Sequence, residues 1–177
     1  MSDRNQLRVA PPGAESLGAG RPKGVPMGRD AEVVLGVIQA VQERDGEKLF
    51  ELYHEDVQLH EAASLPYGGV VDGMPSLREQ LETAPEETWL GTWGPLQPTE
   101  EERRFDPRVL SEKDGEVAVL YWMRAVAPDG ERWESPVIGL YEVRDGKFYR
   151  AKMFHYDTQA MNAFFERARE ASASAAV

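Results

Sequence analysis

Cysteine is absent from the 177 residues of this chain, and basic residues are scarce compared with acidic ones. Without cysteine there is no disulfide bond and no thiolate to act as a nucleophile or metal ligand. Lysine and arginine number 20 against 31 aspartate and glutamate residues, which gives a formal net charge of −11. This charge argues against nucleic acid as a partner, because binding to phosphates needs a basic surface.

Long apolar runs are missing as well. No stretch of the sequence is long enough and apolar enough to span a bilayer. The N-terminal residues are polar and lack the apolar core of a signal peptide. We therefore expect a cytoplasmic protein without a membrane partner.

Several sequence motifs of metal-binding, nucleotide-binding and catalytic sites are also absent. The three histidines do not stand at metal-ligand spacing, and there is no His-Glu-x-x-His. No glycine-rich phosphate loop follows a strand pattern, and Gly-x-Ser-x-Gly does not occur. We therefore expect no metal site and no nucleotide or other organic cofactor.

The two ends of the chain differ in composition from the rest. Residues 1–28 are rich in glycine and proline and carry no periodic apolar pattern, which predicts a flexible tail. Residues 29–170 are assigned to a single domain, because the length and a hydrophobic content of 41% suit one globular core. Residues 171–177 are predicted to form a disordered C-terminus.

Helical patterns come first in the domain, and strand patterns follow. Asp30 is a candidate N-cap for the first helix, and Gly46 offers a left-handed residue to end it. Further helices are expected at 47–53, 74–82 and 158–168, and strands at 57–61, 70–71, 105–111, 117–126, 133–144 and 147–157. Turns such as Asp145-Gly146 between strand patterns mark hairpins. This order predicts an α+β fold with helices on one face of a curved antiparallel sheet.

The last predicted strand carries the strongest functional signal. Alternate side chains share one face of a strand. One face would therefore consist of Tyr149, Ala151, Met153, His155 and Asp157, with Phe148 on the opposite face. Burial in an apolar pocket raises the pKa of a carboxyl group, and a neighbouring histidine can tune it. An imidazole and a carboxylate at the end of an apolar face suit general acid–base chemistry on a small organic molecule.

Parts of the sequence resemble a known family. Residues 43–57 resemble the opening of the NTF2-like superfamily, in which an acidic-Gly break, a short helix and an Asp-Val entry precede the first strand. Residues 65–69, 141–147 and 156–158 resemble its SnoaL-like branch. The resemblance covers about residues 30–168. It implies a conical α+β barrel that encloses an apolar pocket, and a homodimer.

The resemblance also implies a range of functions. The superfamily includes polyketide cyclases, ketosteroid isomerase, dehydratases, epoxide hydrolases and many non-catalytic binding domains. In the SnoaL-like cyclases an Asp near the end of the last strand is the acid–base residue, and Asp157 matches that position. The Arg-x-Asp pair of the epoxide hydrolases is absent, because Arg124 is followed two residues later by Val126.

Each candidate has a competing structural role. Asp157 directly precedes the last helix and could simply cap it, since Asp is among the best N-caps. His155 could be a hydrogen-bonded histidine at the rim of the core. His60 and Glu61 point to opposite faces of their strand, and the sequence leaves open which of the two faces the pocket.

Seven residues are expected to contact a substrate. The segment 83–102 is expected to cover the pocket, with its two tryptophans as a lid. The expected substrate-binding residues are His60, Tyr67, Trp89, Trp93, Tyr121, Trp122 and Met153.

Two hypotheses of function follow. The first is a cofactor-independent enzyme, a cyclase or isomerase, that acts on a hydrophobic carbonyl-bearing small molecule through Asp157 and His155. A dehydratase or hydrolase is a further alternative within this class. The second is a non-catalytic small-molecule-binding or interaction protein. An open cavity reached by both residues would favour the enzyme, whereas a cavity filled by aromatic side chains and an Asp157 bound to helix amides would favour the second hypothesis.

Overall fold

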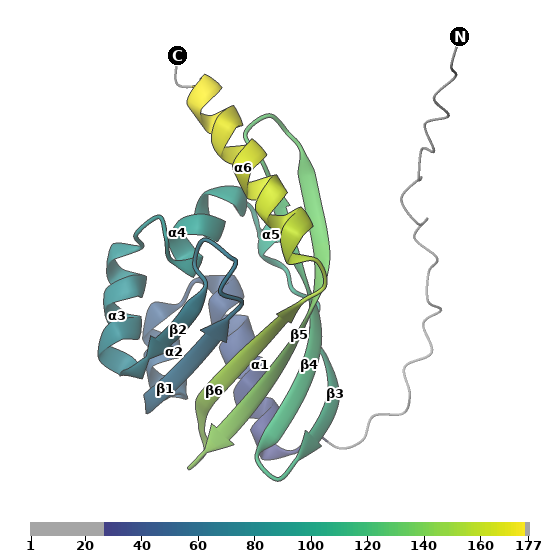
Figure 1. Ribbon diagram of the computed structural model, residues 1–177. Helices are drawn as coiled ribbons and strands as arrows, with labels where there is room; N and C mark the ends of the chain where they lie inside the picture. The colour runs from purple at the N-terminus through teal and green to yellow at the C-terminus, as the bar shows by residue number, and fades with distance from the viewer. Residues whose placement is uncertain (1–26, 176–177) are drawn as a thin grey trace.

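The computed structural model describes residues 27–175, so most of the tail predicted at 1–28 lies outside the described residues (Figure 1). The helices are α1 (Arg29–Glu43), α2 (Gly46–Leu52), α3 (Gly73–Thr83), α4 (Trp89–Trp93), α5 (Glu100–Arg103) and α6 (Thr158–Ala175), with a 3₁₀ turn, η1 (Gly94–Leu96), after α4. The strands are β1 (Tyr53–Glu61), β2 (Gly69–Asp72), β3 (Arg108–Lys113), β4 (Glu116–Val126), β5 (Arg132–Arg144) and β6 (Lys147–His155).

The six strands form one sheet in the order β2-β1-β6-β5-β4-β3. All neighbouring strands are antiparallel except β1 and β6. These two, the first and last strands in the sequence, pair in parallel. The sheet curves around α1, α2 and α3, and α1 packs against β4, β5 and β6 (Figure 1). The predicted α+β fold, with helices on one face of a curved sheet, is confirmed.

Alternation along β4 shows how the sequence builds the concave face. Val117, Val119, Tyr121, Met123 and Ala125 are all buried, and the residues between them are half-buried. A strand with one face on the core produces this period of two. The long pairing with β5, from Glu116 opposite Glu142 to Val126 opposite Arg132, keeps this face in register with that of its neighbour.

The ends of α1 differ from the prediction. The helix begins at Arg29, so Asp30 lies in its first turn and is not its N-cap. The carboxylate of Glu112 in β3 accepts hydrogen bonds from the backbone N–H groups of Gly28, Asp30 and Ala31 at 2.8–3.2 Å. A carboxylate at this position satisfies otherwise unpaired amides and interacts favourably with the positive end of the helix dipole.

At the other end, α1 is closed by Arg44, which has φ 57°, and not by Gly46, which is the first residue of α2. A left-handed conformation is unfavourable for a residue with a side chain. The Arg44 guanidinium donates to the carbonyl oxygens of Gly94 and Gln97 at 3.1 and 2.9 Å, and these bonds offset that cost.

The last helix is longer than predicted. It continues to Ala175, five residues into the segment that was expected to be disordered from 171 onwards. Alanine, glutamate and arginine are good helix formers, which accounts for the extension. Its apolar stripe is buried within this chain: Phe164 packs against Trp133 and Phe165 against Trp93, with ring centroids 5.9 and 5.0 Å apart.

The predicted faces of β6 are wrong at its beginning. The pairing of β5 with β6 shifts between Glu142 and Val143, so that Val143 pairs with Phe148 and Glu142 with Arg150. Tyr149 is the extra residue of this irregularity. A bulge moves the residues before it to the opposite face, and Phe148 therefore joins Ala151 and Met153 on the concave side.

Candidate functional site

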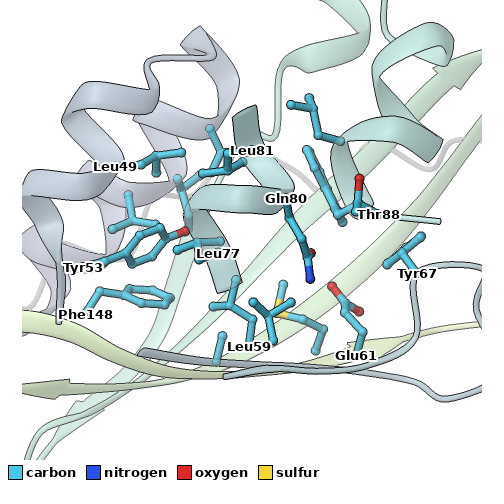
Figure 2. A pocket seen from close by; sticks show the side chains of 18 of the residues that line it. Leu49, Tyr53, Leu59, Glu61, Tyr67, Leu77, Gln80, Leu81, Thr88 and Phe148 are labelled. Carbon is cyan, nitrogen blue, oxygen red and sulfur yellow. The ribbon is translucent and has the colours of Figure 1, made fainter. Parts of the chain in front are cut away.

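A cavity of about 240 Å³ lies between the concave face of the sheet and helices α1 to α4 (Figure 2). Most of its wall is apolar or aromatic. The apolar and aromatic side chains in the wall are Val37, Ile38, Val41, Leu49, Tyr53, Leu59, Tyr67, Val71, Leu77, Leu81, Trp89, Leu90, Phe105, Tyr121, Met123, Tyr141, Phe148, Ala151 and Met153. The remaining residues in the wall are Arg44, Gly46, Glu61, Gln80 and Thr88.

Glu61 brings a carboxylate into this wall from the end of β1 (Figure 2). It shares a strand face with Val57, which is fully buried, and Leu59, which also lines the cavity. The choice that the sequence left open is therefore resolved: Glu61 faces the cavity and His60 does not line it. His60 Nε2 is buried and has no hydrogen-bond partner among the described residues.

His155 stands directly behind Glu61. Its Nε2 lies 2.8 Å from Oε2 of Glu61, and the two side chains are 4% and 14% exposed. The parallel pairing of β1 with β6 brings these residues together although 94 positions separate them. A hydrogen on Nε2 lets the imidazole donate to the carboxylate, so His155 can hold the Glu61 side chain in place beside the cavity.

Four tyrosines, Tyr53, Tyr67, Tyr121 and Tyr141, line the same cavity. Burial raises the pKa of all four phenols above the ordinary value of 10.0. The negative charge of Glu61 adds to this rise in pKa at Tyr67, Tyr121 and Tyr141. The Tyr67 hydroxyl has no hydrogen-bond partner within the described part of the chain. Phenols with a raised pKa stay neutral, so they remain hydrogen-bond donors near an apolar ligand.

These phenols predict a loss of stability in alkali. Because their pKa is higher in the folded state, the folded protein binds more protons above about pH 10 than the unfolded chain does, and the free energy of unfolding falls as the pH rises. Urea titrations between pH 8 and pH 11 should show this fall, and Tyr121→Phe should make it shallower. Tyr156→Phe is the control, since Tyr156 is 82% exposed, and should leave the slope unchanged. A flat profile to pH 11 would contradict the prediction.

Asp157 occupies a different place. It directly precedes α6, and its Oδ1 accepts the backbone N–H of Ala160 at 2.9 Å. The residue is exposed and does not line the cavity. The geometry is that of an N-cap, the structural role that the sequence offered for this residue.

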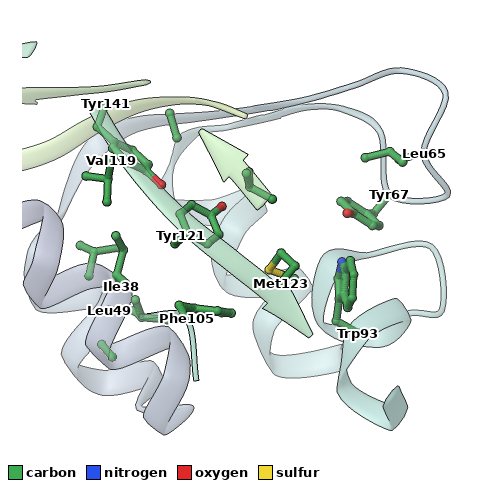
Figure 3. Packing of buried hydrophobic residues seen from close by; sticks show 14 of the residues in the cluster. Ile38, Leu49, Leu65, Tyr67, Trp93, Phe105, Val119, Tyr121, Met123 and Tyr141 are labelled. Carbon is green, nitrogen blue, oxygen red and sulfur yellow. The ribbon is translucent and has the colours of Figure 1, made fainter. Parts of the chain in front are cut away.

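The expected substrate contacts divide into two groups. Tyr67, Trp89, Tyr121 and Met153 line the cavity, whereas His60, Trp93 and Trp122 do not. Trp93 is fully buried and lies next to Tyr67 (Figure 3). Trp122 lies on the opposite face of β4 from Tyr121 and Met123.

Sequence reasoning missed several wall residues. Tyr53, Phe105, Tyr141 and Phe148 were not among the expected contacts, and Glu61 was left undecided. The alternation Val57, Leu59, Glu61 already contained the signal, because two apolar residues on one strand face predict that the third faces the same interior.

The described residues offer no cluster of metal ligands. No group of three or more His, Asp and Glu side chains within residues 27–175 is placed to hold a metal ion. Within the same range, no helix combines the length and apolar character needed to cross a membrane.

The chain belongs to the SnoaL-like domain family, whose family model matches residues 34–151. No curated protein matches the chain. Solved structures of the NTF2-like fold share its architecture, and the predicted NTF2-like fold is thereby confirmed.

Three of these structures illustrate the likeness. TerC, co-crystallised with polyporic acid, has a TM-score of 0.63 and 22% identity, covering 78% of this chain and 99% of its own. Bal32a, from a soil-derived mobile gene cassette, has a TM-score of 0.61 and 21% identity over 77% and 96% of the two chains. An NTF2-like protein from Burkholderia pseudomallei has a TM-score of 0.55 and 16% identity over 76% and 95% of the two chains. Identities this low establish the fold alone.

Proposed function

We propose that the protein is a cofactor-independent enzyme that moves protons on a hydrophobic, carbonyl-bearing small molecule, as a cyclase or isomerase does. The observation that carries this proposal is the carboxylate of Glu61, which faces an apolar cavity with His155 Nε2 at 2.8 Å behind it. The acid–base role expected for Asp157 is assigned to Glu61 in this proposal, because Asp157 is exposed and caps α6.

The proposed reaction begins with removal of a proton next to the substrate carbonyl. The Glu61 carboxylate takes this proton, and the electron pair of the broken C–H bond moves onto the carbonyl oxygen as an enolate. A neutral phenol, that of Tyr121 or Tyr67, donates a hydrogen bond to the developing negative oxygen. Where the enolate is conjugated with a C=C bond of the substrate, Glu61 returns the proton to the far carbon of that bond, and the double bond shifts by isomerisation. Alternatively, the enolate carbon attacks a second carbonyl of the same molecule and Glu61 protonates the new alkoxide, which gives cyclisation.

His155 has a positioning role in this scheme. It holds the Glu61 carboxylate towards the cavity by donating a hydrogen bond to it. A well-placed acid–base group contributes roughly 10²–10⁴-fold to a rate. The apolar wall adds to this by excluding water and holding the reacting atoms close to each other.

Hydrogen exchange at carbon tests this function without knowledge of the natural substrate. We expect the protein in deuterium oxide to accelerate the incorporation of deuterium next to the carbonyl of 2-tetralone, an enolisable two-ring ketone, above the rate in buffer. Nuclear magnetic resonance of the ketone measures the rate. Binding of the ketone without any acceleration would reject the enzymatic proposal.

A non-catalytic small-molecule-binding protein is the second candidate. The observation that favours it is the hydrogen bond from the backbone N–H of Ala160 to the Asp157 carboxylate. An Asp157 bound to helix amides was the arrangement expected of a non-catalytic protein. The exchange experiment separates the two candidates, because a binding protein holds the ketone and leaves the exchange rate at that of buffer.

We also propose a homodimer formed through the outer face of the sheet. Leu120, Ile138 and Phe154 lie opposite one another across β4, β5 and β6, and Ile138 and Phe154 are 42% and 56% exposed. Contiguous apolar surface of this kind marks a contact site, and a two-fold interface uses the same patch on both subunits.

Light scattering at micromolar concentration should give twice the mass of one chain. The double variant Ile138→Lys/Phe154→Lys should give the mass of a single chain, because it places two charges of like sign in the patch of each subunit. A wild-type protein with the mass of one chain would reject the dimer.

A further inference from the structure

The size of the cavity limits what can enter it. An apolar cavity of about 150 Å³ accommodates one benzene molecule. The cavity between the sheet and α1 to α4 measures about 240 Å³, and by proportion it has room for about ten non-hydrogen atoms. Binding pockets leave part of a ligand uncovered, so a molecule of one or two rings fits and a four-ring molecule does not.

The charges around the cavity select against an anion. Arg44 is the one basic side chain in the wall as described, and its guanidinium already donates to the carbonyl oxygens of Gly94 and Gln97. Glu61 contributes a carboxylate with a side chain only 14% exposed, and the whole chain carries a net charge of −11. A ligand carboxylate would meet like charge in a region of low dielectric without a free cation to offset it.

Tyr141 lines the cavity, and Gly139 precedes it by two residues on β5. Gly139 lies on the inner face of β5, opposite Val119 on one side and Met153 on the other. A Cβ atom at this glycine would lie 2.1 Å from the Tyr141 hydroxyl oxygen and 2.2 Å from its Cζ. The Tyr141 ring therefore lies back along its own strand, in the space that a side chain at position 139 would occupy.

This placement brings Tyr141 next to Tyr121. The two phenols neighbour each other on adjacent strands (Figure 3), and each affects the pKa of the other. Any side chain at position 139 would push the Tyr141 ring out of this place and into the cavity, which would shorten the room for a ligand.

We infer that the cavity takes an uncharged ligand of one or two rings, and that Gly139 sets this limit by letting Tyr141 fold back along β5. The inference rests on the proposed function, since it names the substrate class of the same cavity. Equilibrium binding tests it without turnover, so a protein that binds such ligands and fails to catalyse exchange would reject the proposed function and leave this inference intact.

The experiment is calorimetric titration of the full-length protein with three probes. 2-Acetylnaphthalene is a neutral two-ring ketone, 2-naphthoate is its nearly isosteric anion, and 1-acetylpyrene is a neutral ketone with four rings. We expect the two-ring ketone to bind at least tenfold more tightly than either of the others. Equal or tighter binding of the anion, equal binding of the four-ring ketone, or no binding of 2-acetylnaphthalene would each overturn the inference.

A matched pair of variants tests the role of Gly139. Gly139→Ala should weaken binding of 2-acetylnaphthalene at least tenfold. Gly36→Ala is the control, because a Cβ there would meet Leu52 at an ordinary 3.5 Å and Gly36 does not line the cavity; it should leave the affinity unchanged. Unchanged affinity in folded Gly139→Ala would overturn the assignment.

A second variant tests the role of Tyr141 by enlarging the cavity. It does not require Gly139→Ala to fold. Tyr141→Leu removes an aromatic ring from the wall of the cavity. It should raise the affinity for 1-acetylpyrene at least tenfold over the wild-type value. A Tyr141→Leu protein that still excludes the four-ring ketone would show that Tyr141 does not limit ligand size.

Discussion

Glu61→Gln is expected to lower the rate of hydrogen exchange into a bound ketone at least 100-fold. Glutamine keeps the shape of the side chain and can still accept from His155 Nε2, which is 2.8 Å away in the native protein. It cannot take up a proton, and removing a general base of this kind costs roughly 10²–10⁴-fold in rate. The change should leave the affinity for the ketone within a fewfold of wild type, because the shape of the cavity is retained.

Asp157→Asn is the matched control for this result. Asparagine is nearly as good an N-cap as aspartate, so the bond to the amide of Ala160 can be kept. We expect a rate within twofold of wild type. The opposite pattern, with Glu61→Gln active and Asp157→Asn inactive, would move the acid–base role back to the end of the last strand.

Trp93→Ala is expected to have the largest effect on stability. The side chain is completely buried and packs against Tyr67, Trp133 and Phe165, with ring centroids 5.0–6.5 Å apart. Truncation of a buried tryptophan to alanine costs about 3–5 kcal/mol. For a chain of this length that corresponds to a drop in Tm of about 6–20 °C, which differential scanning calorimetry measures.

Trp89→Ala provides the comparison, since Trp89 lies in the same helix, α4, and lines the cavity. We expect it to cost less than half as much stability, because this half-buried ring borders an open cavity and leaves less of a new one behind. It should instead weaken ligand binding. Equal losses of Tm in the two variants would show that both tryptophans belong to the packed core.

Much of the fold could be predicted from local patterns. The period of two in residues 117–126, the turn residues between the strands and the helical stripe that includes Phe164 and Phe165 each fix an element by short-range rules. The observed β4 and β5 differ from their predicted ranges by one residue each, and α6 begins where predicted but continues seven residues further. Residues 43–57 and 141–147 supplied the family resemblance, and the match to the SnoaL-like family confirms it.

The features that could not be predicted depend on contacts between distant parts of the chain. Glu112 caps a helix 82 residues before it, and no local pattern around Asp30 signals this. The bulge at Tyr149 inverts the first residues of β6, and it depends on the pairing with β5. Asp157 was ambiguous for a chemical reason, because the same carboxylate and the same position before a helix serve both a cap and an acid–base group.

The direction of the Glu61 side chain could have been predicted from the sequence, whereas its partner could not. Val57 and Leu59 predict the inner face of β1 and hence the direction of Glu61, whereas its contact with His155 requires the parallel pairing of β1 with β6. Strands at opposite ends of a sequence give no short-range sign that they are neighbours. The pair therefore becomes visible only in the folded sheet.

The most direct test of the central claim is the crystal structure of the protein with 2-tetralone bound. Reacting atoms in a productive complex lie about 3–3.5 Å apart. We predict the ketone inside the cavity, with a carbon next to its carbonyl at about that distance from a Glu61 carboxylate oxygen and its carbonyl oxygen within hydrogen-bond reach of a tyrosine hydroxyl. A ketone bound outside the cavity, or one whose reactive carbon faces Asp157 and not Glu61, would contradict the account.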